Sequence, residues 1–266
     1  MSHLQDKLLE LKQFQEDAAI RIQTLGQFKL WRENEKVDSK QWGRDKTVQL
    51  LQYLISNRQR HALHKESIME HLWEEGDDRD FKVALHGVNK VLEPNRPSRT
   101  EPSFVIRQGV SYQLDLDKIW IDVEALEQYI IVGNEAFGKE MAVSKAAYKS
   151  AIALYQGVYL PNRVFEDWSS EEREKIQVLI LGAYVILAEI LLNENPLESI
   201  RLAQCAIAID KTWEDAYRLQ MQAYLIKGNR PQAIKAYQKC ADVLEEEYGI
   251  DPLPETKRVL QEIESI

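Results

Sequence analysis

The 266-residue sequence has little cysteine, no long apolar run and no overall excess of positive charge. Its two cysteines, Cys205 and Cys240, fall in helical patterns and cannot form a disulfide framework, which indicates reduced thiols in a cytosolic protein. The longest apolar run, residues 178–192, contains Glu189 and is too short to span a bilayer. Charges interrupt the first apolar positions, so no signal peptide is expected. These features argue against secreted and membrane proteins.

The formal net charge of −9 is distributed unevenly. Residues 21–115 carry 16 basic against 14 acidic side chains, whereas residues 116–266 carry 16 against 25. The N-terminal half is therefore neutral to slightly basic, and the acidic charge lies in the other half. A basic surplus of this size predicts only weak nonspecific attraction to nucleic acid phosphates.

Hydrophobic periodicity predicts an α+β domain near the N-terminus. Residues 3–17 form an amphipathic helix that must dock on another part of the protein, because it is too short to be stable alone. The expected elements that follow it are a strand region at 20–31 with a break at Gly26, helices at 46–54, 64–73 and 81–92, and a hairpin of residues 104–106 and 111–114. This order is typical of a winged helix, which we assign to residues 20–115, after a docking helix in residues 1–19.

The second domain is assigned to residues 116–266, and from Asp122 onward only helices are predicted. Two helical pairs repeat with offsets of 33 and 34 residues, as when Ala183 and Tyr184 correspond to Ala216 and Tyr217. Small side chains at regular intervals allow close helix packing, and they are Ala203, Ala206, Ala216, Ala223, Ala233 and Ala236. This period indicates an all-α, tetratricopeptide-like helical-repeat domain.

Several motifs resemble those of a known family of regulators. The C-terminal half contains YQGVYLP at residues 155–161, then Trp168, and later DAYR at 215–218 and YGIDPLPET at 248–256. These motifs resemble the bacterial transcriptional activator domain. Upstream, Leu25-Gly26, Leu72-Trp73 and Tyr112 are similar to the winged helix that precedes this domain in the streptomycete antibiotic regulatory protein family. The resemblance covers nearly the whole chain from about Ile20.

The resemblance implies DNA binding, with the third helix in the major groove and the wing on the DNA backbone. The residues that this assigns to DNA contact are Lys82, His86, Asn89, Lys90 and Arg107. Asparagine can pair with adenine and lysine with guanine or phosphate. Family recognition helices are usually rich in arginine, whereas residues 81–92 contain none. This difference keeps open an alternative, in which a second-messenger-sensing adaptor binds another transcription factor and contacts DNA little.

A group of charged and aromatic residues suggests an effector site. An arginine and an acid can hydrogen-bond a guanine base while an aromatic ring stacks on it, and further arginines can bind phosphates. The residues concerned are Arg58, Arg60, Arg96, Arg99, Arg163, Asp167 and Trp168. The arrangement of a winged helix followed by a helical-repeat domain resembles that of cyanobacterial regulators that act as cyclic di-GMP receptors. This resemblance makes cyclic di-GMP the predicted ligand. Alternatively, these arginines contact DNA phosphates or hold helices together.

No pattern points to catalysis or to a required cofactor. Residues 133–139 have the glycine and lysine spacing of a phosphate loop, but Glu140 stands where serine or threonine would hold magnesium, and a helix-like run precedes them. His61, His64 and His71 do not match a known ligand set, so no metal site is expected.

We therefore predict a cytoplasmic, non-enzymatic transcriptional regulator. Its predicted partners are DNA, another transcription factor or RNA polymerase, and a second copy of the chain, with no membrane. A nucleotide or protein that prefers one arrangement of the two modules would change how the third helix and the wing are presented.

Overall fold

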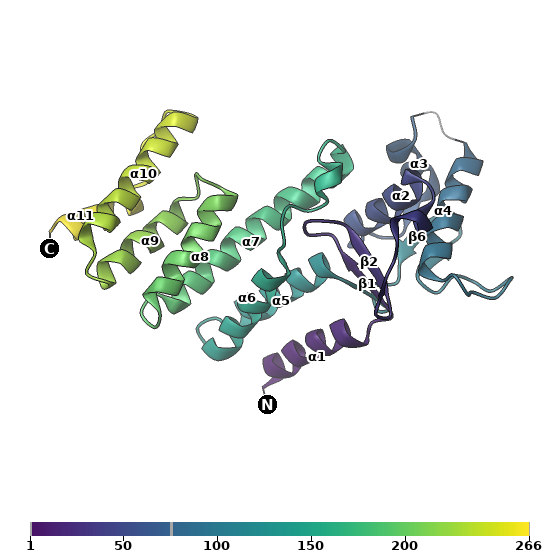
Figure 1. The fold of residues 1–266 in the computed structure, drawn as a ribbon, viewed down its shortest axis with the longest axis horizontal. Coiled ribbons are helices and arrows are strands. Elements are labelled where there is room, and N and C mark those ends of the chain that lie inside the picture. The colour runs from purple at the N-terminus through teal and green to yellow at the C-terminus, as the bar shows by residue number, and fades with distance from the viewer. Residues whose placement is uncertain (1, 75–76, 266) are drawn as a thin grey trace. The chain divides into compact units, whose positions relative to one another are not determined.

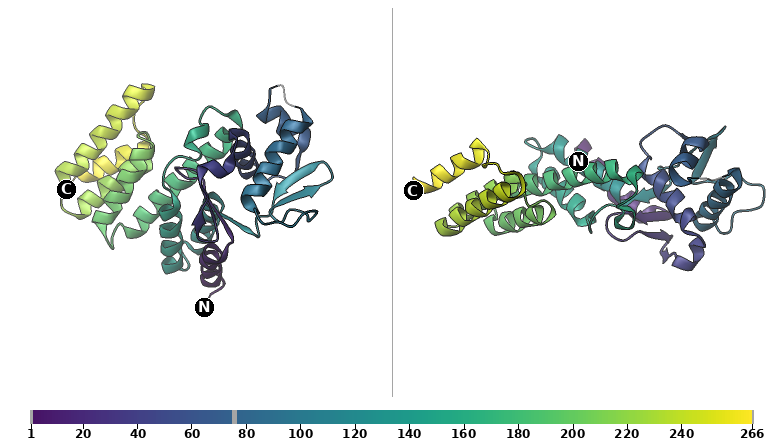
Figure 2. Two further views of the ribbon diagram at one scale, coloured as in Figure 1. Left: turned by 45° about the vertical axis from the view of Figure 1, so that its right-hand side comes forward. Right: turned by 90° about the horizontal axis from the view of Figure 1, so that it is seen from above.

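The computed structural model describes residues 2–74 and 77–265. Most of the protein is helical, and two small sheets lie in its N-terminal half (Figures 1 and 2). An N-terminal part with strands and helices followed by an all-helical part is thus confirmed. Within the described ranges, no helix is long and apolar enough to cross a membrane.

The chain forms two compact units that are not continuous in sequence. The mixed unit contains residues 9–125 and 154–176, and the helical unit contains residues 1–8, 126–153 and 177–266. The boundaries fall within four helices, which are α1 (His3–Asp17), α5 (Asp122–Ala136), α6 (Met141–Leu154) and α7 (Ser170–Leu191). The sequence predicted three linear segments, 1–19, 20–115 and 116–266, whose outermost residues Met1 and Ile266 lie outside the described part. The structure instead packs residues 154–176 with the N-terminal strands.

A four-stranded sheet of order β3-β2-β1-β7 opens the mixed unit. Its strands are β1 (Ile20–Gln23), β2 (Lys29–Arg32), β3 (Glu35–Lys36) and β7 (Ile119–Ile121). The strand region predicted at residues 20–31 is confirmed, and the break at Gly26 has a clear cause. Gly26 has φ +83°, and a Cβ there would lie 3.0 Å from the carbonyl oxygen of Gln156. A side chain at this position would therefore be both strained and crowded.

Three helices and a second sheet complete the fold of the mixed unit. The helices are α2 (Asp45–Ser56), α3 (Lys65–Leu72) and α4 (Asp78–Leu92), preceded by the 3₁₀ turn η1 (Ser39–Trp42). The sheet has the order β4-β6-β5, with β4 (Leu63–His64), β5 (Val105–Gln108) and β6 (Ser111–Leu114). Phe81 of α4 packs edge-on against Tyr112 of β6 at 5.1 Å between ring centroids. This contact joins the apolar side of α4 to the hairpin.

Residues 154–176 contribute two 3₁₀ turns, η2 (Pro161–Arg163) and η3 (Asp167–Ser169), to the mixed unit. The fully buried Tyr159 forms a bridge with Leu25, and its hydroxyl lies 2.8 Å from Ser56 Oγ. The amide of Leu160 donates to the carbonyl oxygen of Thr24 at 2.9 Å. Backbone pairing and burial therefore bind this segment to β1 and α2.

A buried carboxylate joins the first sheet to the start of α5. Asp122 is 2 % exposed and accepts hydrogen bonds from four donors: the Thr24 amide (2.8 Å) and hydroxyl (2.6 Å), and the amides of Leu25 (2.9 Å) and Val123 (2.8 Å). Burial raises the pKa of Asp122 to about 6, while these hydrogen bonds act in the opposite direction. The carboxylate thus satisfies backbone donors that the strand pairing leaves open.

The helical unit holds the C-terminal helices α8 (Pro196–Ile209), α9 (Glu214–Ile226), α10 (Arg230–Tyr248) and α11 (Pro254–Glu264). Helices α8, α9 and α10, coloured green to yellow, pack side by side (Figures 1 and 2). The small side chains predicted to allow this packing are all buried, and they are Ala203, Ala206, Ala216, Ala223, Ala233 and Ala236. Close approach of helices through small residues is therefore confirmed.

The phosphate-loop spacing lies mostly in a helix. Gly133 falls inside α5, which continues to Ala136, and only residues 137–140 connect α5 to α6. A Cβ at Gly133 would lie 3.0 Å from the ring of Tyr148, and the carbonyl oxygen of Gly133 accepts a hydrogen bond from Ser144 Oγ at 2.9 Å. This glycine therefore permits close packing of α5 and α6, and it does not follow a strand as a phosphate loop requires.

Candidate functional site

Helix α4 presents one buried and one exposed face. It begins earlier than the predicted residue 81 because Asp77 and Asp80 form a capping box, in which the Asp77 side chain accepts from the amides of Arg79 and Asp80. Its buried residues are Phe81, Ala84, Val88, Asn89, Val91 and Leu92. Its exposed face carries Arg79, Lys82, Val83, His86 and Lys90. The spacing of three, four and seven residues places this set on one side of the helix.

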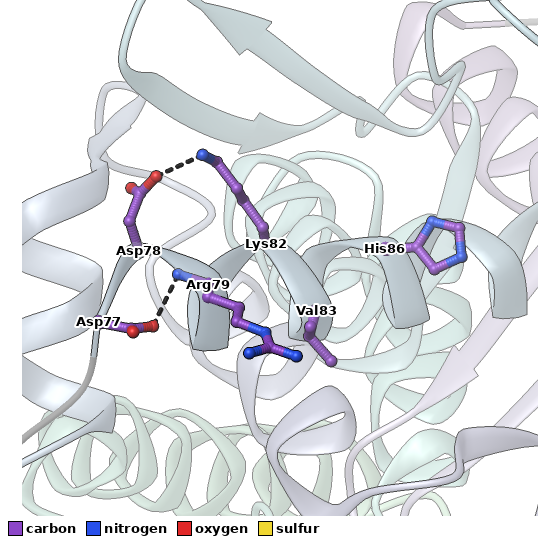
Figure 3. A pocket seen from close by; sticks show the side chains of 6 residues that line it. All are labelled: Asp77, Asp78, Arg79, Lys82, Val83 and His86. Atoms are coloured by element: carbon purple, nitrogen blue, oxygen red, sulfur yellow. Dashed lines mark hydrogen bonds and ion pairs between the residues drawn. The ribbon is translucent and has the colours of Figure 1, made fainter.

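Two acids accompany the basic side chains at the start of α4. The ammonium group of Lys82 lies 2.5 Å from Asp78 Oδ2, and Lys65 also pairs with Asp78. These two hydrogen bonds lower the pKa of Asp78 to about 2, so this carboxylate is charged at neutral pH. In Figure 3, Lys82 lies at one edge of this exposed face and reaches back toward Asp78, whereas the side chains of Arg79 and Val83 point away from Asp78. The residues drawn there line an open hollow of about 630 Å³.

A second hollow, of about 370 Å³, lies between α4 and the β5–β6 hairpin. Lys65, Lys82, His86 and Arg107 bring nitrogen donors to its wall. Arg107 donates from Nε to the carbonyl oxygen of Gly109 at 2.8 Å, and its guanidinium lies 6.0 Å from the centroid of the Tyr112 ring. The hairpin turn and the ring therefore hold this exposed cation beside α4.

The predicted DNA-contact residues differ in their exposure. Lys82, His86, Lys90 and Arg107 are exposed, but Asn89 is only 7 % exposed. Asn89 lines the smaller hollow, and its Oδ1 has no hydrogen-bond partner among the described residues. Four of the five side chains are therefore accessible without a rearrangement, and a base contact by Asn89 stays a prediction.

Among the predicted effector residues, Arg58 and Arg60 have opposite surroundings. The Arg58 side chain is 1 % exposed and forms ion pairs with Glu124 at 2.7 Å and Glu172 at 2.6 Å. Arg60 pairs with Glu171 at 2.8 Å, and both of these side chains are largely exposed. The positive charge of Arg58 is therefore already balanced inside the mixed unit.

The predicted guanine-binding set does not converge on one point. Arg163 donates from Nε to Gln52 Oε1 at 2.9 Å and forms an ion pair with Asp45 on α2. Asp167 is exposed, and the Trp168 ring packs edge-on against Tyr53 at 5.6 Å. In this arrangement Arg163 and Trp168 bind segment 154–176 to α2, and an effector role for this set stays a prediction.

The two loop arginines lie after α4. Arg96 is half-buried, and its Nη1 lies 3.9 Å from Glu93. Arg99 is exposed and has a positive φ of 68°, which is uncommon for a residue with a side chain. Arg99 has no ion-pair partner among the described residues, so of the predicted effector arginines it is the one with an open charge.

Comparison with known proteins identifies the helical part. The bacterial transcriptional activator domain profile matches residues 121–264, which is more than half of the chain. This chain belongs to the bacterial transcriptional activator domain family. The activator domain begins at Ile121, the last residue of β7, and includes the segment 154–176 that packs in the mixed unit. The predicted resemblance to a streptomycete antibiotic regulatory protein-like regulator with this domain is confirmed.

A solved structure has a similar fold over most of this activator-domain protein. It is the Mycobacterium tuberculosis protein EmbR, in complex with a low-affinity phosphopeptide. The TM-score is 0.78 at 16 % sequence identity, and the match covers 94 % of this chain and 66 % of that one. The chain thus spans slightly less than two thirds of EmbR's length, and at this identity the likeness concerns the fold. No curated protein matches by sequence.

Sequence reasoning missed two basic residues beside the predicted DNA-contact set. Arg79 lies in the first turn of α4, and Lys65 begins α3 beside Asp78. The signal for Arg79 was present, because Asp77 followed by Asp80 has the spacing of a capping box and places Arg79 inside the helix. Lys65 could not be found in this way, because its position depends on packing between α3 and α4.

Proposed function

We propose that this activator-domain protein is a non-enzymatic transcriptional regulator that binds DNA through a winged helix. Helices α2–α4 and the β4-β6-β5 sheet supply the elements of this fold, with α4 as the helix that enters the major groove. The observation that carries the proposal is the exposed basic row of Arg79, Lys82, His86 and Lys90, opposite the buried face of α4. Membership of an activator family supports it independently.

The side chains divide into two kinds of contact. Arg79, Lys82 and Lys90 reach base edges or phosphates from α4, and Arg107 on the hairpin binds a phosphate of the neighbouring backbone. Asp77 and Asp78 lie beside these cations and reduce the attraction for arbitrary DNA. Because phosphate contacts are weak in total, sequence-dependent contacts must supply more of the affinity.

The test is a gel shift on duplexes selected from a randomised pool by the full-length protein. The double variant Lys82→Ala with Lys90→Ala is expected to abolish the shift, because both lysines supply phosphate or base contacts. Both lysines are exposed, so helical content measured by circular dichroism should not change. The control, Lys12→Ala with Lys227→Ala, removes two exposed charges elsewhere and should leave the shift intact.

A shift that survives in the α4 variant would exclude α4 as the DNA-contacting helix. The second candidate function, an adaptor that binds another transcription factor, then takes its place. One observation favours the adaptor: Asp78 pairs with both Lys65 and Lys82, which leaves fewer open cations for phosphate. An adaptor would select no duplex from the pool in the absence of its partner.

We further propose that an effector controls the regulator, and cyclic di-GMP is the predicted one. Arg99→Ala is expected to weaken cyclic di-GMP binding to the full-length protein by about tenfold or more, because a charge-assisted hydrogen bond contributes about 1.5–3 kcal/mol. Calorimetry with GTP and cyclic di-AMP measures the selectivity, and the exposed Arg258→Ala serves as a matched control. Equal affinity of Arg99→Ala and wild type would remove Arg99 from the site, and no binding by wild type would remove this ligand.

A further inference from the structure

A groove in the helical unit has a composition unlike its surroundings. It has a volume of about 550 Å³ and runs along α8, α9 and α10. Its polar lining comprises Lys211, Lys235, Lys239, Gln204, Gln220, Gln232 and Tyr224. No acidic side chain lines it, although residues 116–266 carry 25 acidic against 16 basic residues. The groove is therefore a basic site within an acidic part of the chain.

The groove residues on α10 lie on one face of the helix. Gln232, Lys235, Ala236, Lys239 and Val243 follow one another at intervals of three or four residues or stand side by side, which places them on one face of α10. From Gln232 to Val243 this face is about 16 Å long. An extended peptide of about five residues has the same length.

The two lysines on the α10 wall are available to bind a ligand. Lys235 and Lys239 are exposed, and neither has an ion-pair partner among the described residues. Lys211, in the turn between α8 and α9, differs because it pairs with Glu247, which raises the pKa of Lys211. Two unpaired ammonium groups one helical turn apart can each meet a carboxylate of a bound partner.

The floor of the groove adds an independent observation. Gln220 of α9 is only 8 % exposed, and its amide has no hydrogen-bond partner among the described residues. Its amide atoms still reach solvent, since they are not among the fully buried polar atoms that lack a partner, and they are therefore available to a bound group. Ile207, Ala208 and Ala236 supply apolar surface next to it. An amide that can both donate and accept, beside apolar walls, suits a peptide backbone with alternating side chains.

We propose that this groove binds a short, extended, acidic peptide segment of a partner protein. The open lysines take the carboxylates, Gln220 and its neighbouring glutamines bond the peptide backbone, and apolar side chains rest on the floor. A nucleic acid fits less well, because the groove offers only two open lysines, Lys235 and Lys239, and so few phosphate contacts. The proposal concerns the helical unit only and does not depend on DNA binding by α4.

The test measures fluorescence anisotropy with the full-length chain and three labelled peptides of equal length. These are alternating Glu-Leu, Gln-Leu and Lys-Leu peptides, and the acidic one is expected to bind most tightly. Lys235→Glu with Lys239→Glu should weaken the acidic peptide about tenfold or more and make the basic peptide the preferred one. The control Lys12→Glu with Lys227→Glu makes the same change in net charge at exposed sites outside the groove and should keep the acidic preference.

Two results would overturn the proposal. In the first, wild type binds the acidic peptide no better than the neutral one, or the groove variant keeps the wild-type order. In the second, an oligothymidylate binds more tightly than the acidic peptide with the same dependence on Lys235 and Lys239, which assigns the groove to nucleic acid. If the charge reversal disturbs folding, Lys235→Gln with Lys239→Gln provides the same test, because it should equalise the acidic and neutral peptides.

Discussion

Arg58→Ala is expected to lower the free energy of unfolding of the mixed unit by about 3–5 kcal/mol, the range for removing one partner of a buried ion pair. The Arg58 side chain is 1 % exposed, and its two ion-pair partners differ in position, with Glu124 on α5 and Glu172 on α7. The variant leaves the Glu172 side chain, which is 11 % exposed, without this positive charge. Segment 154–176 and the start of α5 then lose their common attachment to the end of α2.

Urea unfolding followed by tryptophan fluorescence measures this loss. Five of the six tryptophans lie in the mixed unit, and they are Trp31, Trp42, Trp73, Trp120 and Trp168. Arg60→Ala is the matched control, because its pair with Glu171 is exposed and should contribute less than about 1 kcal/mol. Arg58→Met combined with Glu172→Gln should regain part of the loss, since the largely buried carboxylate that lost Arg58 is then replaced by a neutral amide. Equal urea midpoints for Arg58→Ala and Arg60→Ala would show that the buried ion pair contributes no more to stability than the exposed one.

Asp122→Ala is expected to have an effect of similar size, about 3–5 kcal/mol, because each buried donor left without an acceptor costs about 1–3 kcal/mol. The substitution removes the acceptor of the amides of Thr24, Leu25 and Val123 and of the Thr24 hydroxyl. Relaxation and water entry reduce the sum below that of four independent losses. The same fluorescence-detected unfolding measures the change, because β1, β7 and the start of α5 all belong to the mixed unit.

Two further variants separate hydrogen bonding from simple loss of volume. Asp122→Asn keeps the size of the side chain but replaces one acceptor oxygen by a donor that faces other donors, so it should remain clearly destabilising. Asp117→Asn changes an exposed carboxylate of the loop before β7, and it should be nearly neutral. If Asp122→Asn were as stable as wild type, the four hydrogen bonds would not hold the strand to the helix.

The local elements were predictable because periodicity and capping act within a few residues. The amphipathic pattern at 3–17 matches α1, and the helices expected near 46–54, 64–73 and 81–92 are present as α2, α3 and α4. Strand β7 was missed, since its three residues are all buried and show no alternation. Its pairing with β1 is parallel and joins residues about a hundred positions apart, which no local pattern encodes.

In the candidate DNA-contact surface, too, local patterns predicted some features and long-range packing decided others. The basic positions Lys82, His86 and Lys90 could be placed on one face of a helix from their spacing alone, and the structure leaves them exposed. Asn89 has the same helical context but turns toward the hairpin and is buried, because the sheet covers that side of α4. Exposure at such a border position depends on which element packs there.

Sequence alone thus determined the helices, the first hairpin strands, the two kinds of fold and the regulator family, because each depends on short-range patterns or on motifs. Tertiary structure determined which arginines form ion pairs with acidic side chains. The sequence does not distinguish Arg58 and Arg163 from Arg99. In the structure, Glu124 and Glu172 neutralise Arg58, and Asp45 neutralises Arg163; all three acids come from distant segments. Tertiary structure also brought residues from three helices together as the basic groove around Gln220. The physical reason is that electrostatic partners and solvent access are set by distances in space, which the order of residues along the chain does not specify.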